Sequence, residues 1–226
     1  MAARAFVWAG GALFVGSLAY CAWWYLFALS LTRPQVSWSA LGLDALLVGV
    51  FALHHSVLAR ESVKARVSRL VPEPLIRSVY VWTASVLLIL VCAWWAPIGG
   101  ELYNDGGGWL AFVHAAVQLY GVWLIVQSVR GIDPLELAGI RREAARGALQ
   151  IRGPYALVRH PLYFGWVLAV FGAAHMTGDR FAFAVITTLY LVIAVPWEER
   201  SLVRSFGDDY VRYTRVVRWR IVPFIY

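Results

Sequence analysis

Long apolar runs alternate with short polar segments along most of the chain. A membrane helix needs about 20 apolar residues, and because backbone polar groups in lipid must be paired within the segment, each run is predicted to be a helix. Four runs reach that length. Two later ones are shorter and are joined by Thr177-Gly178-Asp179-Arg180, which predicts a helical hairpin. The six predicted spans are Ala5–Leu31, Trp38–Leu58, Val79–Pro97, Trp109–Val129, Leu162–Met176 and Phe181–Trp197.

Basic residues gather in alternate connections between these runs. All 20 lysine and arginine residues except Arg33 and Arg180 lie before the first span, in the second or fourth connection, or after the last span. Positively charged loops stay in the cytoplasm. The pattern therefore predicts six helices with both termini cytoplasmic.

Composition supports a membrane protein. The chain is 61% hydrophobic and only 15% charged, whereas soluble domains are roughly half apolar. A net charge of +7 could suggest nucleic acid, but the basic residues flank apolar runs, where membrane topology accounts for them. We expect a single all-α integral membrane domain over residues 1–226, in contact with the lipid bilayer and not with nucleic acid. Its four N-terminal spans would occupy residues 1–130. The helical hairpin and a cytoplasmic C-terminal helical segment would occupy residues 131–226.

The cysteines and the first run add little chemistry. Cys21 and Cys92 each lie inside an apolar run and lack the clustered spacing of a disulfide framework or a zinc site, so no metal is expected. The first run is too long for a signal peptide and lacks a cleavage site. We expect it to be a retained helix.

A first polar motif stands where the fourth connection enters the fifth span. It contains Arg159, His160, Pro161, Tyr163 and Gly165. Pro161 suits the first turn of a helix, where its missing N–H would be unpaired anyway. The free N–H groups that follow carry partial positive charge and favour a carboxylate.

A second motif follows the last apolar run. The adjacent carboxylates of Glu198-Glu199 are costly at a membrane helix end unless they face water or a cation. Gly207 then breaks the helix, and Tyr210 and Tyr213 fall on one face of a further helix, followed by Arg218. Each motif alone is open to a plainer reading, as membrane anchors or as a salt-bridged face of Glu198-Glu199 with nearby arginines. Together they favour a ligand site.

The two motifs resemble those of the isoprenylcysteine carboxyl methyltransferase superfamily. Segments 52–60 and 133–140 are similar to its NnrU and methanethiol S-methyltransferase-like branch. The resemblance implies a site for S-adenosylmethionine. The implied cofactor-binding residues are His160, Pro161, Tyr163, Gly165, Glu198, Glu199, Tyr210, Tyr213 and Arg218.

The physical chemistry of the cofactor agrees with this assignment. A carboxylate and aromatic faces hold a sulfonium cation, and Arg159 or His160 could bind the cofactor's carboxylate. We expect methyl transfer in a cytoplasmic pocket to a small or lipophilic acceptor: a thiol, an isoprenylcysteine-like carboxylate or a lipid amine. The candidate catalytic residues are Glu199 and, as the base for a thiol, His54 or His55. A His pair bonded only to neighbouring helices is an equal alternative.

Two other functions stay open at this point. The tails of membrane sterol and steroid reductases also resemble the first motif and would imply NADPH, although Glu198-Glu199 suits a sulfonium better than a pyrophosphate. A non-enzymatic NnrU-like protein or a transporter is the third possibility, but broken helices with midplane charges are not evident. The branch suggests a bacterial inner membrane.

Overall fold

The computed structural model describes residues 1–58, 63, 66–141 and 148–226. Within this part of the chain the structure is mostly helical, and five helices are long and apolar enough to cross a membrane. The chain forms two compact units, Met1–Gly100 with Ile132–Ala145, and Glu101–Gly131 with Arg146–Tyr226. Four of the predicted cytoplasmic basic residues, Arg60, Lys64, Arg142 and Arg146, lie outside the described residues.

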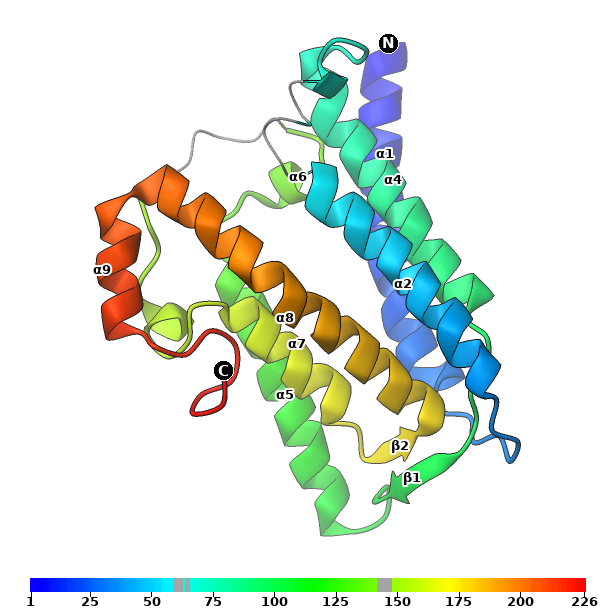
Figure 1. Ribbon diagram of the computed structural model, residues 1–226. Helices are drawn as coiled ribbons and strands as arrows, with labels where there is room; N and C mark the ends of the chain where they lie inside the picture. The colour runs from blue at the N-terminus through cyan, green and yellow to red at the C-terminus, as the bar shows by residue number, and fades with distance from the viewer. Residues whose placement is uncertain (59–62, 64–65, 142–147) are drawn as a thin grey trace. The chain divides into compact units, whose positions relative to one another are not determined.

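The first unit is built on three long helices that lie side by side (Figure 1). They are α1 (Ala2–Trp23), continued by the π-helical turn η1 (Trp24–Ala28), α2 (Trp38–Leu58) and α4 (Glu73–Trp94). Helix α4 packs against both of the others. The short helix α6 (Pro134–Leu137) begins at Asp133, whose side chain accepts a hydrogen bond from the backbone N–H of Leu135.

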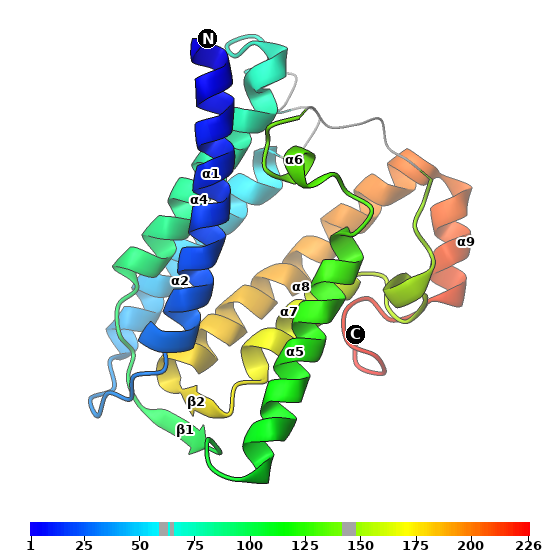
Figure 2. The same ribbon diagram turned by 180° about the vertical axis from the view of Figure 1, so that it is seen from behind.

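The second unit contains α5 (Trp109–Val129), the 3-10 turn η2 (Gly153–Ala156), α7 (Pro161–Phe171), α8 (Gly178–Phe206) and α9 (Asp208–Val216). Helix α7 packs against α5 and α8, as both views show (Figures 1 and 2). Two short antiparallel strands, β1 (Glu101–Asn104) and β2 (His175–Thr177), join the turns before α5 and α8.

Helix boundaries agree with the sequence prediction where apolar runs end at turns. Trp38–Leu58 and Trp109–Val129 are α2 and α5 as predicted. In contrast, α7 ends at Phe171, before the expected Met176, because the chain turns at Gly172 and enters β2. Thr177, expected in a tight turn, instead caps α8 by accepting a hydrogen bond from the backbone N–H of Arg180. Helix α6 ends at Leu137, and residues 142–147 lie outside the described part.

Two glycines bring α5 and α7 into close contact. A Cβ on Gly165 would lie 2.5 Å from the carbonyl oxygen of Gly121 and 2.9 Å from the Ile125 side chain. A Cβ on Gly121 would lie 2.6 Å from the Gly165 carbonyl oxygen. Small residues at such crossings let membrane helices pack backbone to backbone. Gly165, a predicted cofactor-binding residue, therefore faces α5 in this structure.

The glycine contact predicts the effect of adding one methyl group. Gly165→Ala should force α5 and α7 apart and lower the unfolding free energy by about 2 kcal/mol, the usual cost of overpacking. Thermal unfolding of the purified protein in detergent measures the change. Gly49→Ala on α2, whose new Cβ meets nothing within 4 Å, is the matched control. Equal melting temperatures for the two variants would contradict the packing role of Gly165.

Candidate functional site

The two sequence motifs meet in the second unit, where the loop before α7 reaches the C-terminal tail. Pro161 is the first residue of α7 and His160 is its N-cap. The backbone N–H of Arg159 donates to the Trp219 carbonyl at 2.9 Å, and that of His160 donates to the Arg220 carbonyl at 2.8 Å. These two backbone hydrogen bonds join the C-terminal tail to the residues just before α7.

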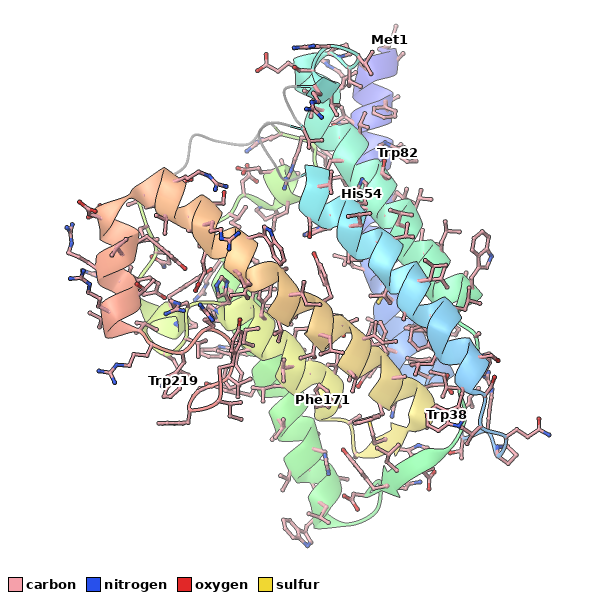
Figure 3. The ribbon with its side chains drawn as sticks, in the orientation of Figure 1. Met1, Trp38, His54, Trp82, Phe171 and Trp219 are labelled. Atoms are coloured by element: carbon pink, nitrogen blue, oxygen red, sulfur yellow. The ribbon has the colours of Figure 1, made fainter. Side chains whose placement is uncertain are left out.

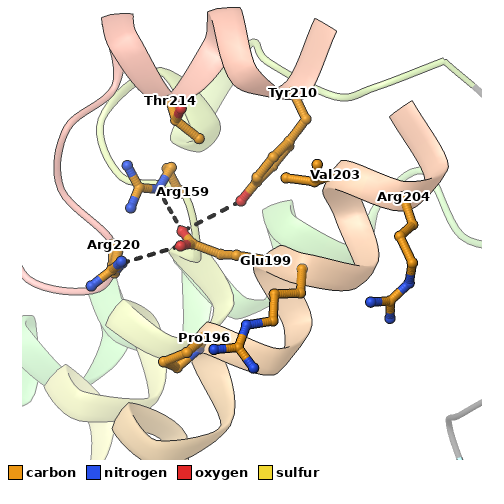
Figure 4. A pocket seen from close by; sticks show the side chains of 9 residues that line it. Arg159, Pro196, Glu199, Val203, Arg204, Tyr210, Thr214 and Arg220 are labelled. Atoms are coloured by element: carbon orange, nitrogen blue, oxygen red, sulfur yellow. Dashed lines mark hydrogen bonds and ion pairs between the residues drawn. The ribbon is translucent and has the colours of Figure 1, made fainter. Parts of the chain in front are cut away.

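Glu199, near the end of α8, is the centre of the polar contacts. Its Oε1 accepts from Arg159 Nε at 2.6 Å and from the Tyr210 hydroxyl at 3.4 Å, and its Oε2 accepts from Arg220 Nε at 3.1 Å (Figure 4). Only 13% of the Glu199 side chain and 8% of the Arg159 side chain are exposed. Charge-assisted hydrogen bonds at such sites are short and strong. One carboxylate thus connects α8 with the loop before α7, with α9 and with the tail.

Arg159 and Arg220 differ in how firmly they are held. Arg159 Nη1 also donates to the carbonyls of Val217 and Arg218, at 3.1 and 3.2 Å. Arg220 lies with its guanidinium 5.1 Å from the centre of the Tyr226 ring, and 37% of its side chain is exposed. Arg159 is therefore the buried partner of Glu199, and Arg220 is the more accessible one.

Glu198 belongs to a second polar group beside the first. The Tyr163 hydroxyl donates to Glu198 Oε2 at 2.7 Å. The His160 ring stacks on that of Tyr163 with centroids 5.4 Å apart. Its Nδ1 lies 3.7 Å from Glu198 Oε2, and its Nε2 lies 3.5 Å from Glu199 Oε1. His160 therefore stands between the two adjacent carboxylates.

The two tyrosines of α9 anchor that helix. Tyr210 and Tyr213 are buried and pack with Val217, against which Leu149, Leu202 and Phe206 also lie. The Tyr213 hydroxyl donates to the Tyr155 carbonyl at 2.6 Å. Burial raises the pKa of both phenols, and the Glu199 carboxylate raises that of Tyr210 further. Both hydroxyls therefore remain protonated donors at neutral pH.

A cavity of about 690 Å³ opens at this site (Figure 4). Its volume falls within the range of about 300–1,000 Å³ that is typical of small-molecule sites. Five of its lining residues are charged. The lining residues are Arg159, Pro196, Glu199, Arg200, Val203, Arg204, Tyr210, Thr214 and Arg220.

The structure separates the predicted cofactor residues by position. Arg159, Glu199 and Tyr210 line the cavity. His160, Tyr163 and Glu198 form the adjoining polar group, and Tyr213 packs behind Tyr210. Pro161 and Gly165 are buried. The Arg218 side chain is exposed, and its carbonyl rather than its guanidinium meets Arg159.

Sequence reasoning missed Arg220, Arg200, Arg204 and Thr214 as lining residues. Arg220 stands two positions after Arg218 in a tail without regular secondary structure. No periodicity could therefore indicate which tail arginine turns inward. The sequence shows the i, i+4 spacing of Arg200 and Arg204, but this spacing fits a solvated helix face as well as it fits a cavity wall.

The candidate base residues lie in the other unit, near the end of α2 (Figure 3). The Tyr80 hydroxyl and His55 Nδ1 are hydrogen-bonded at 2.6 Å. The His54 ring stacks on Tyr80 with centroids 5.5 Å apart. Both His54 ring nitrogens are buried and make no hydrogen bond with the described residues. A catalytic role for either histidine stays a prediction.

Removing the central charge should loosen the whole site. In Glu199→Gln the buried Arg159 loses its anionic partner, and breaking a buried pair in this way costs about 3 kcal/mol. We expect a lower melting temperature and faster amide hydrogen exchange at Arg159 and His160, whose N–H groups bind the tail. Asp209→Asn, which breaks an exposed ion pair with Arg212, should change stability by less than about 1 kcal/mol. Equal effects of the two substitutions would contradict the central role of Glu199.

Comparison with known proteins gives a consistent family. The phospholipid methyltransferase family matches residues 110–209. Methanethiol S-methyltransferase of Crocosphaera subtropica (strain ATCC 51142 / BH68) is 36% identical over 195 residues, which cover 83% of this chain and 76% of the relative. The enzyme of that name from Pseudomonas deceptionensis is 34% identical, over 81% of this chain and 74% of the relative.

A more distant match is Nurim of Xenopus laevis, 30% identical over 67% of this chain and 58% of that protein. No solved structure matches. The resemblance drawn from the two motifs is confirmed, and it extends well beyond them along the chain. The chain belongs to the methyltransferase family that contains the methanethiol S-methyltransferases.

Proposed function

We propose that the protein is an integral membrane methyltransferase that uses S-adenosylmethionine and methylates a small thiol. The observation that carries this is the cavity at the junction of both motifs, in a chain whose relatives are named for methyl transfer to methanethiol. Family membership already implies a methyl donor. What we propose beyond this is that the donor is S-adenosylmethionine and that the acceptor is a small thiol.

The proposal includes the placement of the protein in the membrane. We place both termini and the cavity on the cytoplasmic side of a bacterial inner membrane, because the basic residues concentrate in alternate connections. The five long apolar helices and the shorter α7 together would make six membrane helices. With 11 residues α7 is about 16 Å long, so it would reach through about half of the hydrocarbon core and form a hairpin with α8.

The residues around the cavity fit the proposed cofactor. Tyr210 and Glu199 offer the aromatic face and the carboxylate that favour a cationic sulfonium. Guanidinium groups in the same lining suit the carboxylate of an amino acid. When bound, S-adenosylmethionine would supply a methyl group on a sulfonium, which accepts the electron pair of the broken bond as the thiol sulfur gains the methyl.

The protein's own contribution is chiefly positioning and proton transfer. Tyr210, Arg159 and Arg220 hold the Glu199 side chain in one orientation, and such preorganisation can supply much of a rate enhancement. A thiol acceptor must also lose its proton. We propose that a ring nitrogen of His54 or His55 takes that proton, with the Tyr80 hydroxyl orienting the His55 ring.

Cofactor binding is the first test. Calorimetry on the detergent-purified full chain should show micromolar binding of S-adenosylmethionine and none of NADPH. Glu199→Gln should weaken that binding, and Asp209→Asn should leave it unchanged. Binding of NADPH instead would assign the protein to the reductases. Binding of neither would remove the enzymatic proposal.

The base role predicts a pH-dependent defect. His54→Gln or His55→Gln should lower methyl transfer to methanethiol about a hundredfold at pH 7, a usual contribution of a general base. The defect should shrink as pH rises, because the thiol then ionises without help. Initial rates of dimethyl sulfide formation across pH measure this effect. His175→Gln, at a histidine paired with Glu101 in the other unit, is the control.

Full activity of both single variants at pH 7 would remove the histidines from the mechanism. A loss that is the same at every pH would assign them a structural role.

A further inference from the structure

Two arginines on the last turns of α8 take no part in the hydrogen bonds around Glu199. Arg200 and Arg204 both line the cavity, and their i, i+4 spacing places them on one face of the helix. Within the described part of the chain, neither guanidinium makes a hydrogen bond or an ion pair. Arg159 and Arg220, by contrast, are paired with Glu199, and Arg212 is paired with Asp209.

The charges that line the cavity do not balance. Four arginines line it, whereas Glu199 is the carboxylate among its described lining residues. That single negative charge is already shared by Arg159 and Arg220. Arg200 and Arg204 are both exposed at the cavity wall, and none of its described lining residues provides a further carboxylate to pair with them.

An unbalanced positive wall is a poor site for a ligand that is cationic overall. S-adenosylmethionine carries a sulfonium, an ammonium and one carboxylate. It can approach four arginines favourably only if the carboxylate meets Arg200 and Arg204. Guanidinium groups bind carboxylates with paired, charge-assisted hydrogen bonds.

We propose that Arg200 and Arg204 form a clamp for the carboxylate of the methyl donor. The inference rests on the proposed function and adds the orientation of the donor, with its amino-acid end along α8. Neither residue is among the cofactor-binding residues that the two sequence motifs imply. They are positioning residues, since they would hold the donor at a group that does not react.

The clamp makes binding depend on the donor's carboxylate. The test compares S-adenosylmethionine with its decarboxylated form, which lacks that one group. Calorimetry on the detergent-purified full chain gives both dissociation constants for the wild type, Arg200→Gln, Arg204→Gln and the double variant. Each single variant should bind S-adenosylmethionine about tenfold more weakly, as expected for one lost charge-assisted contact.

The decarboxylated donor carries two positive charges and no negative one, so the arginine variants should bind it at least as tightly as the wild type does, because each substitution removes a repelling charge. Arg212→Gln, a nearby arginine of α9 that does not line the cavity, should bind both ligands as the wild type does. Arg204→Lys should recover part of the affinity for S-adenosylmethionine, because it keeps the charge and loses only the planar fork.

Several results would overturn the clamp. These are equal losses for the two ligands in the arginine variants, or no loss for either ligand. In each of these cases wild-type protein still binds S-adenosylmethionine, so the proposed function stands. Failure of the wild type to bind S-adenosylmethionine would instead remove the proposed function and the clamp together.

Discussion

The ordered site depends on one partly buried carboxylate. Glu199 is held by Arg159, Arg220 and the Tyr210 hydroxyl, so it connects the end of α8 to the loop before α7, to α9 and to the tail. A buried carboxylate is stable only when its charge is compensated and its oxygens accept hydrogen bonds. The three partners come from segments far apart in sequence, and none of them would be fixed by local structure alone. Glu199 therefore organises the cavity as well as lining it.

The helices of the second unit provide the rigid base for that arrangement. Gly121 and Gly165 let α5 and α7 approach to backbone contact, and Pro161 begins α7 at the point where His160 turns towards the carboxylates. Helix α8 continues well past its apolar part, so that Glu198 and Glu199 stand on a regular helix and not on a loop. Sites on helices hold their geometry more accurately than sites on loops. A positioning mechanism of methyl transfer needs that accuracy.

Charge divides the cavity into two regions with different roles. The Glu199, Tyr210 and Arg159 region is saturated by internal hydrogen bonds, whereas Arg200 and Arg204 bring positive charge that no described carboxylate balances. The aromatic face of Tyr210 in the first region suits a sulfonium, and the guanidinium groups of Arg200 and Arg204 in the second suit a carboxylate. The same distribution disfavours a purely cationic ligand, which the guanidinium groups would repel. The proposed selectivity for a donor with an intact carboxylate rests on this division.

The sequence alone determined the features that depend on local pattern. Apolar length predicted the helices, Trp38–Leu58 and Trp109–Val129 among them, and Pro161 and Gly207 marked where α7 begins and α8 ends. Its two motifs also identified Arg159, Glu199 and Tyr210, which the fold brings together. Only the tertiary structure decided that Arg220 rather than Arg218 turns its guanidinium to Glu199, that Gly165 faces α5, and that α7 stops at Phe171. These outcomes depend on contacts between distant segments, and a run of side chains carries no information about which distant backbone it will meet.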